Sequence, residues 1–263
     1  MSSSLKRRLL VIVILSASAL LPTAVLALEK TDFIDTNRPS FMFSPLVVPQ
    51  ASVQLENGTL YQHLQHGGTY YDISETQVRL GLTGRTEFQM FVPSFVLLRQ
   101  AHAPATTAGA SDLTEVGFKH QFPTVKKFQI TFIGAMNLPT GSKTISGSGV
   151  EPVFRMPWAY PIKGGWQIMG MQSLLLLNSG GALEYEPDFM LSKSFGPRAG
   201  LFAEYGGFFT QGRAGLSIAH FGAVYRPARH HQLDVQCGFG LNKSAPAAFV
   251  GAGYSYRFDH LPW

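Results

Sequence analysis

Residues 248–258 read AFVGAGYSYRF, and their side chains alternate between two kinds. One set is apolar or aromatic and consists of Val250, Ala252, Tyr254, Tyr256 and Phe258. The other set is small or polar and consists of Gly251, Gly253, Ser255 and Arg257. Because successive side chains of a strand point to opposite faces, this alternation predicts a β-strand with one apolar face and one small, polar face.

The same alternation recurs along the chain and predicts an all-β fold. It is clear in TQVRLGL at 76–82, TEFQMFV at 86–92 and LDVQCGFGL at 233–241. The segment 151–161 is the weakest of the predicted strands because it contains three prolines, which cannot donate hydrogen bonds to a sheet. In all we predict about twelve strands, near residues 51–62, 71–82, 86–98, 112–122, 127–138, 151–161, 165–177, 184–195, 198–209, 213–226, 230–241 and 247–258.

The composition indicates that much of this sheet does not face water. Only 14% of the 263 residues are charged, whereas soluble domains carry about 25%. Beyond residue 30, no apolar run approaches the roughly 20 residues that a spanning helix needs. A membrane-spanning sheet has to close on itself so that every backbone group is paired. A soluble sandwich would alternate in the same way, but the low charge favours a single antiparallel, up-and-down transmembrane β-barrel.

The first 27 residues have the organisation of a cleaved secretory signal peptide. A basic start at Lys6, Arg7 and Arg8 precedes an apolar run over residues 9–15, and Val25-Leu26-Ala27 fits a cleavage site. This segment holds three of the 21 basic residues and none of the 16 acidic ones, so 18 basic and 16 acidic residues remain, a net charge of +2. The mature chain therefore predicts no nucleic-acid partner.

The connections between strands differ at the two ends of the predicted barrel. TGR, PTVKK, PIKGG, GP and RPARH are short, whereas the stretches at 99–111 and 139–150 are long. Bacterial outer-membrane barrels combine short periplasmic turns with longer outer loops. We therefore expect the protein in the outer membrane of a Gram-negative bacterium, with outer-membrane lipid, the outer-membrane assembly machinery and a small-molecule solute as its partners.

Several blocks of sequence resemble one protein family. They are DTNRPSFMFSPLVVPQASVQLENG at 35–58, RLGLTGRTEFQM at 79–90, MNLPTGS at 136–142, FGPRAGLFAEYGG at 195–207, QLDVQCGFGLN at 232–242 and FVGAGYSYRF at 249–258. They resemble the outer-membrane transporters named for the meta-pathway of phenol degradation. The resemblance covers nearly all of the mature chain. It implies one outer-membrane barrel with a porin-like or uptake role, and it brings no catalytic or binding residues.

Eight charged side chains fall on the predicted interior face of the barrel. They either line a lumen that selects small solutes, or form a salt-bridged network that fills a narrow interior. Twelve strands lie between eight, which side chains fill, and sixteen, which leave a channel, so both readings stay open. Across the turn at 83–85, Arg79 and Glu87 are predicted to form an ion pair. The lumen-lining candidates are Glu56, Arg79, Glu87, Glu115, Lys119, Glu204, Asp234 and Arg257.

The predicted domains flank one barrel over residues 51–258, with a C-terminal tail at 259–263. The preceding segment, 28–50, contains Pro39, Pro45 and Pro49 and has no strand pattern. Proline favours an extended chain there, and such a segment could enter the lumen as a plug or stay in the periplasm. In contrast, interior glycines of the last two strands predict free space beside them, and these are Gly238, Gly240, Gly251 and Gly253.

The sequence predicts no enzyme, no metal site and no cofactor. Ser217 and His220 are the nearest nucleophile and base, but they fall on opposite faces of one strand. The histidines at 63, 66, 230 and 231 lie in loops, and no cysteine or carboxylate joins them at ligand spacing. Two functions remain: a porin-like channel for small, aromatic or apolar solutes, or a closed structural or interaction barrel that acts through its outer loops.

Overall fold

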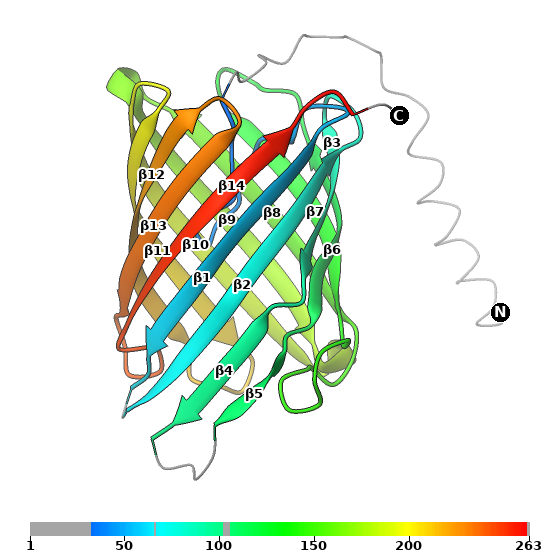
Figure 1. Ribbon diagram of the computed structural model, residues 1–263, viewed down its shortest axis with the longest axis vertical. Helices are drawn as coiled ribbons and strands as arrows, with labels where there is room; N and C mark the ends of the chain where they lie inside the picture. Colours follow the sequence, from blue (N-terminus) through cyan, green and yellow to red (C-terminus); the bar gives the residue numbers. More distant parts are fainter. Residues whose placement is uncertain (1–32, 66, 102–105, 262–263) are drawn as a thin grey trace, which may run out of the picture. The chain divides into compact units, whose positions relative to one another are not determined.

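The computed structural model describes residues 33–65, 67–101 and 106–261, so the predicted signal peptide lies outside the described residues. One antiparallel sheet contains all fourteen strand segments, and β14 pairs with β1 to close it into a barrel (Figure 1). The strands are β1 (Val53–His63), β2 (Gly68–Gly81), β3 (Thr86–Val92), β4 (Phe95–Gln100), β5 (Thr107–Ala110), β6 (Leu113–Gln121), β7 (Gln129–Leu138), β8 (Glu151–Pro161), β9 (Trp166–Leu177), β10 (Ala182–Phe195), β11 (Ala199–Thr210), β12 (Leu216–Ala228), β13 (His231–Gly240) and β14 (Ala248–Phe258). Two short 3-10 turns, η1 (Lys163–Gly165) and η2 (Asn178–Gly180), lie between strands.

The wall of the barrel has twelve strand positions, as the alternation predicts. The predicted strand 86–98 is broken into two segments, β3 and β4, and β5 lies within residues 99–111, where the sequence predicts a long loop. β3 and β4 both pair with β2, β3 through Thr76–Gly81 and β4 through Gly68–Ile73, and they are separated by Pro93 and Ser94. Because proline cannot donate to the ladder, the strand is interrupted at that point. β5 and β6 are separated at Ser111 and Asp112.

The proline-containing segment 151–161 is a strand, β8. It pairs with β9 from Val153 to Pro161 without a break. Its ladder with β7 runs from Asn137↔Glu151 to Gln129↔Ala159, but the rungs between Ile133 and Ile130 are missing. Pro157 lies opposite that gap, and the register is the same on both sides of it. The missing N–H of proline therefore costs local hydrogen bonds without displacing the strand.

The two faces of the wall differ as predicted. Val250, Tyr254 and Phe258 are exposed by 45–54% on the outside, whereas Ser255 and Arg257 are at most 3% exposed. Other strands repeat this arrangement: Leu233 and Val235 are half exposed on β13, and Asp234 is buried. So large a surface of exposed apolar side chains is an interaction surface, and around a closed barrel it is the band that contacts lipid.

No helix within the described part of the chain is both long and apolar enough to cross a membrane.

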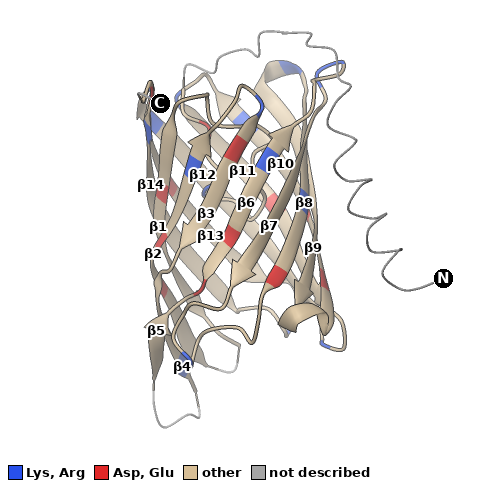
Figure 2. Cartoon of the chain, turned by 90° about the vertical axis from the view of Figure 1, so that its right-hand side faces the viewer, with Lys and Arg blue, Asp and Glu red and all other residues tan. Residues whose placement is uncertain are grey.

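The end of the barrel at which β14 ends has short turns with basic residues (Figure 2). The opposite end holds the longer connection over residues 139–150, together with the β4–β5 hairpin (Figure 1). This asymmetry places the short turns on the periplasmic side and the longer loops outside. The basic residues of the turns are Arg85, Lys126, Lys127, Lys163, Arg198 and Arg229.

Candidate functional site: the occupied barrel interior

The described part of the N-terminal segment, residues 33–50, lies inside the barrel, and we call it the plug. Ile34, Met42 and Val48 are each 1% exposed. Met42 and Phe43 belong to an apolar cluster with wall residues that include Ile133, Val153 and Met171. The plug has no strand pairing of its own, so its backbone N–H groups need other acceptors.

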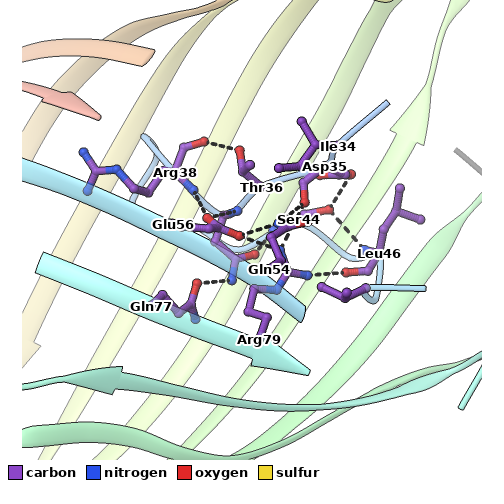
Figure 3. Close-up of polar contacts among 12 residues, drawn as sticks. Ile34, Asp35, Thr36, Arg38, Ser44, Leu46, Gln54, Glu56, Gln77 and Arg79 are labelled. Atoms are coloured by element: carbon purple, nitrogen blue, oxygen red, sulfur yellow. Dashed lines mark hydrogen bonds and ion pairs between the residues drawn. The ribbon is translucent and has the colours of Figure 1, made fainter. Parts of the chain in front are cut away.

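Three glutamates of the wall supply those acceptors (Figure 3 shows the contacts around Glu56). Each carboxylate accepts one or two hydrogen bonds from plug N–H groups, and all three glutamates are at most 5% exposed. Such bonds to a charged acceptor are stronger than bonds between neutral groups. The bonds run from Asn37 and Arg38 to Glu56 at 2.8 and 3.0 Å, from Phe41 and Met42 to Glu204 at 3.1 and 3.0 Å, and from Val48 to Glu87 at 2.5 Å.

Arg79 of β2 links two of these glutamates. Its Nη1 lies 2.8 Å from Glu56 Oε1, and its Nε lies 2.8 Å from Glu87 Oε1, which confirms the predicted Arg79–Glu87 pair. It also donates to the plug carbonyls of Asp35 and Leu46, at 3.2 and 3.0 Å. Lys119 Nζ lies 3.6 Å from Glu87 Oε1. These buried charges neutralise one another and hold the plug at the same time.

Arg38 of the plug fits into a gap in the wall at β1, β2, β13 and β14. Its guanidinium lies 3.1 Å from Glu75 and 3.4 Å from Asp234. The gap exists because two neighbouring wall positions are glycines: a Cβ at Gly58 would lie 2.0 Å from Arg38 Cζ, and one at Gly253 would lie 2.5 Å from Arg38 Nε. Any side chain at either position would therefore collide with the arginine.

The expectation of free space beside the interior glycines is wrong. Gly253 makes room for Arg38, as described above. A Cβ at Gly238 would lie 2.4 Å from the ring of Phe249, which is itself 3% exposed. A Cβ at Gly240 would lie 2.8 Å from Ala245 Cβ. The space beside Gly238, Gly240 and Gly253 is thus filled by other parts of the chain.

A second buried cluster surrounds Arg155 of β8, farther toward the outer end. Its Nη2 lies 2.7 Å from Glu115 Oε1, and its Nη1 lies 2.5 Å from Glu186 Oε2. Nη1 also donates to Ser173 Oγ at 2.7 Å. The guanidinium carbon lies 5.5 Å from the ring centre of Phe43 in the plug, a cation–π arrangement.

His220 of β12 pairs with Glu204 and does not meet Ser217. Its Nδ1 lies 2.6 Å from Glu204 Oε2, and its ring lies 4.4 Å from that of Phe41. Ser217 Oγ instead lies 3.1 Å from Tyr205 Oη. The geometry that a serine nucleophile needs is absent at these two residues. Among residues 33–65, 67–101 and 106–261, no group of three His, Cys, Asp or Glu side chains could hold a metal ion.

All eight candidates from the sequence are buried inside the barrel, but they do not form one lining. Sequence reasoning missed further charged residues of the interior, among them Arg155, Glu186 and Asp188. Arg155, Glu186 and Asp188 share a signal that could have found them, because they alternate with outward aromatic residues on β8 and β10. The groups are Glu56, Arg79, Glu87 and Lys119 together; Glu115 with Arg155; Glu204 with His220; Asp234 with Arg38; and Arg257 with Asp259 at 2.7 Å.

Two cavities lie on either side of a turn of the plug. A cavity of about 360 Å³ on the periplasmic side is lined by residues near the short turns, such as Gln129, Gln167 and Arg226. A cavity of about 330 Å³ on the outer side is lined by Phe208, Glu186 and others. Both are lined by Arg38, Pro39 and Ser40 as well. The turn at 38–40 therefore separates two spaces within one lumen.

A closed antiparallel barrel with an apolar outer band and a charged, plugged interior is an outer-membrane β-barrel protein. Residues 36–258 match the protein family described as "Putative MetA-pathway of phenol degradation", and the chain belongs to that family. The resemblance of the sequence blocks is thereby confirmed. No curated protein matches the chain in sequence.

Solved outer-membrane barrels share the fold. The COG4313 outer membrane channel from Pseudomonas putida F1 has 14% identity, with 82% of this chain and 98% of that chain covered and a TM-score of 0.60. The NanC porin has 8% identity, coverage of 77% and 98%, and a TM-score of 0.55. The KdgM porin in complex with disordered oligogalacturonate has 10% identity, coverage of 79% and 99%, and a TM-score of 0.53. These similarities show the fold alone.

Proposed function

We propose that the protein is an outer-membrane channel for small solutes, with a lumen that the plug closes at rest. The observation that carries this proposal is the pair of cavities that meet the same plug residues, Arg38–Ser40, from opposite sides. Withdrawal of this turn would join the two cavities. Similar folds in proteins that are named channels and porins support the proposal.

The contacts that hold the plug are polar and reversible. Glu56, Glu87 and Glu204 bind it through backbone N–H groups, so a rearranged plug can exchange these bonds for water. The wall closes through its own strand pairing, in which β1 pairs with both β14 and β2. In this proposal, residues 1–27 are removed on export, lipid and the assembly machinery are the partners, and no catalytic step occurs.

One observation favours the alternative of a closed barrel that acts through its outer loops. The loop over residues 139–150 is folded back onto Asp112, which accepts hydrogen bonds from Gly141 N and Gly147 N at 2.8 Å each and from Ser146 Oγ at 2.6 Å. An ordered outer loop is a suitable surface for another protein. This alternative requires that the lumen never conducts.

A variant in which one contact between wall and plug is weakened distinguishes the channel from the closed barrel. In planar bilayers, Glu204→Gln is expected to open more often than the natural protein, because Gln keeps only one good acceptor for Phe41 N and Met42 N. Glu184→Gln is the matched control, since Glu184 bonds Thr210 and not the plug. If the natural protein and Glu204→Gln are silent to ions and to small aromatic solutes, the channel function is refuted and the closed barrel is preferred.

A further inference from the structure

The outer cavity combines apolar rings with an excess of acidic groups. Its walls include four phenylalanines, four carboxylates and two arginines. At about 330 Å³, it is near the lower end of the range for pockets that bind small molecules. An apolar body of small size with a polar group at one end would match these walls.

The two arginines are already engaged, and one carboxylate is left over. Arg155 bonds Glu115 and Glu186, and Arg38 bonds Glu75 and Asp234. Asp188 is 2% exposed, and its Oδ1 has no hydrogen-bond partner among the described residues. A buried carboxyl without a partner is costly to ionise, and a cation that reaches it would stabilise its ionised form.

The surroundings of Asp188 suit an organic cation. Asp188 lies directly across from Gly206 of β11. A Cβ at Gly206 would lie 2.8 Å from the ring of Phe41 and 3.3 Å from Asp188 Oδ1. Because Gly206 has no side chain, the Asp188 carboxyl group and the Phe41 ring border the same small space. An ammonium group bound beside Asp188 would also contact the ring of Phe41, and such a cation–π contact is attractive.

We propose that the outer cavity is a binding subsite for small organic cations, with the ammonium group paired to Asp188 and an aromatic or aliphatic body against the phenylalanines. This inference rests on the proposed channel function and names its class of solute. The same acidic walls repel organic anions, and a neutral alcohol of the same shape lacks the charge that Asp188 requires.

Calorimetry on the intact protein in detergent tests the subsite with benzylamine, benzyl alcohol and benzoate at pH 7. Benzylamine, which is a cation there, is expected to bind about tenfold or more tightly than benzyl alcohol, and benzoate is expected not to bind. Asp188→Asn should weaken benzylamine binding by about tenfold, because the charged partner is lost. Glu184→Gln removes a carboxylate of the same strand outside the cavity and should leave binding within about twofold.

Equal affinity for the amine and the alcohol, or an unchanged affinity in Asp188→Asn, would overturn the subsite. Asp188 Oδ1 has no hydrogen-bond partner among the described residues, so the asparagine variant breaks no bond at that atom and should assemble. If the asparagine variant does not assemble, the affinities of the natural protein for the three ligands still test the subsite. Binding is measured without transport, so a silent bilayer with selective amine binding would refute the channel and leave the subsite in place.

Discussion

Replacing Glu87 with glutamine is expected to destabilise the barrel by about 3 kcal/mol, because it breaks a buried ion pair on one side only. The Glu87 carboxylate is 0% exposed and accepts bonds from Arg79 Nε at 2.8 Å, Arg79 Nη2 at 3.0 Å and Val48 N at 2.5 Å. Losing one partner of a buried pair costs about 3–5 kcal/mol. Arg79 keeps Glu56 at 2.8 Å, which places the cost at the lower end.

A double-mutant cycle resolves the pair itself. Arg79→Met alone leaves Glu56 and Glu87 with fewer donors and should cost a similar amount. The double variant should be milder than the sum of the two, with a coupling of about 2 kcal/mol. Glu184→Gln, whose carboxylate is partly buried and bonds Thr210, is the control and should cost about 1 kcal/mol or less.

The assay is urea unfolding of the protein in lipid vesicles, followed by the change in electrophoretic mobility between folded and unfolded barrel. The slope of free energy against urea has to stay the same in all variants, so that only stability is compared. Strict additivity of the two single variants would show that Arg79 and Glu87 do not interact, and it would refute the reasoning from the buried network.

Three further outcomes are expected. Val235→Lys should impair assembly by about 2–4 kcal/mol because Val235 faces lipid, whereas Gln236→Lys, its inward neighbour at the outer cavity, should assemble; equal effects would contradict the assignment of faces. Gly58→Ala should displace the Arg38 guanidinium and raise ion conductance in bilayers, and an unchanged conductance would argue against a fixed Arg38. Partial burial alone would raise the pKa of Asp112, but hydrogen bonds from Ser146 and from the N–H groups of Gly147 and Gly141 hold that pKa below its ordinary value of 3.8. The stabilisation of the outer loop is therefore present above pH 3.8 and is lost as pH falls through the lowered pKa. Hydrogen exchange at Gly141 and Gly147 should rise at that low pH and in Asp112→Asn, and exchange rates without this rise would contradict the anchoring of the loop by Asp112.

The wall of the barrel could be predicted from the sequence because a strand's alternation is a local property. In residues 248–258, side chains two positions apart lie on the same face of the strand, so their polarity shows which face is apolar. The closed sheet then follows from the need to pair every backbone group in the membrane. The strand break at Pro93 was not predicted, since alternation continues on both sides of it, and β5 lies in residues 99–111, which the sequence predicts as a long loop. The proline-containing strand β8 was predicted with the right bounds.

The contents of the lumen could be predicted only in part. Interior charges such as Arg79 and Glu87 follow from parity, and their pairing follows from a tight turn. Contacts between the plug and the wall join residues far apart in sequence, such as Arg38 and Asp234, and no periodicity reports them. For the same reason, interior glycines indicated empty space, although Gly253 in fact makes room for a side chain from the plug.

The central claim, that the plug closes a lumen able to conduct, is tested most directly by deleting residues 30–48 and measuring conductance in planar bilayers. Strand pairing begins at Val53, so the shortened barrel should still assemble, and its electrophoretic mobility should change on heating as that of a folded barrel does. The intact protein should conduct little, and the deletion variant clearly more, because the turn at 38–40 no longer separates the two cavities. An assembled deletion variant that conducts no more than the intact protein would contradict the account.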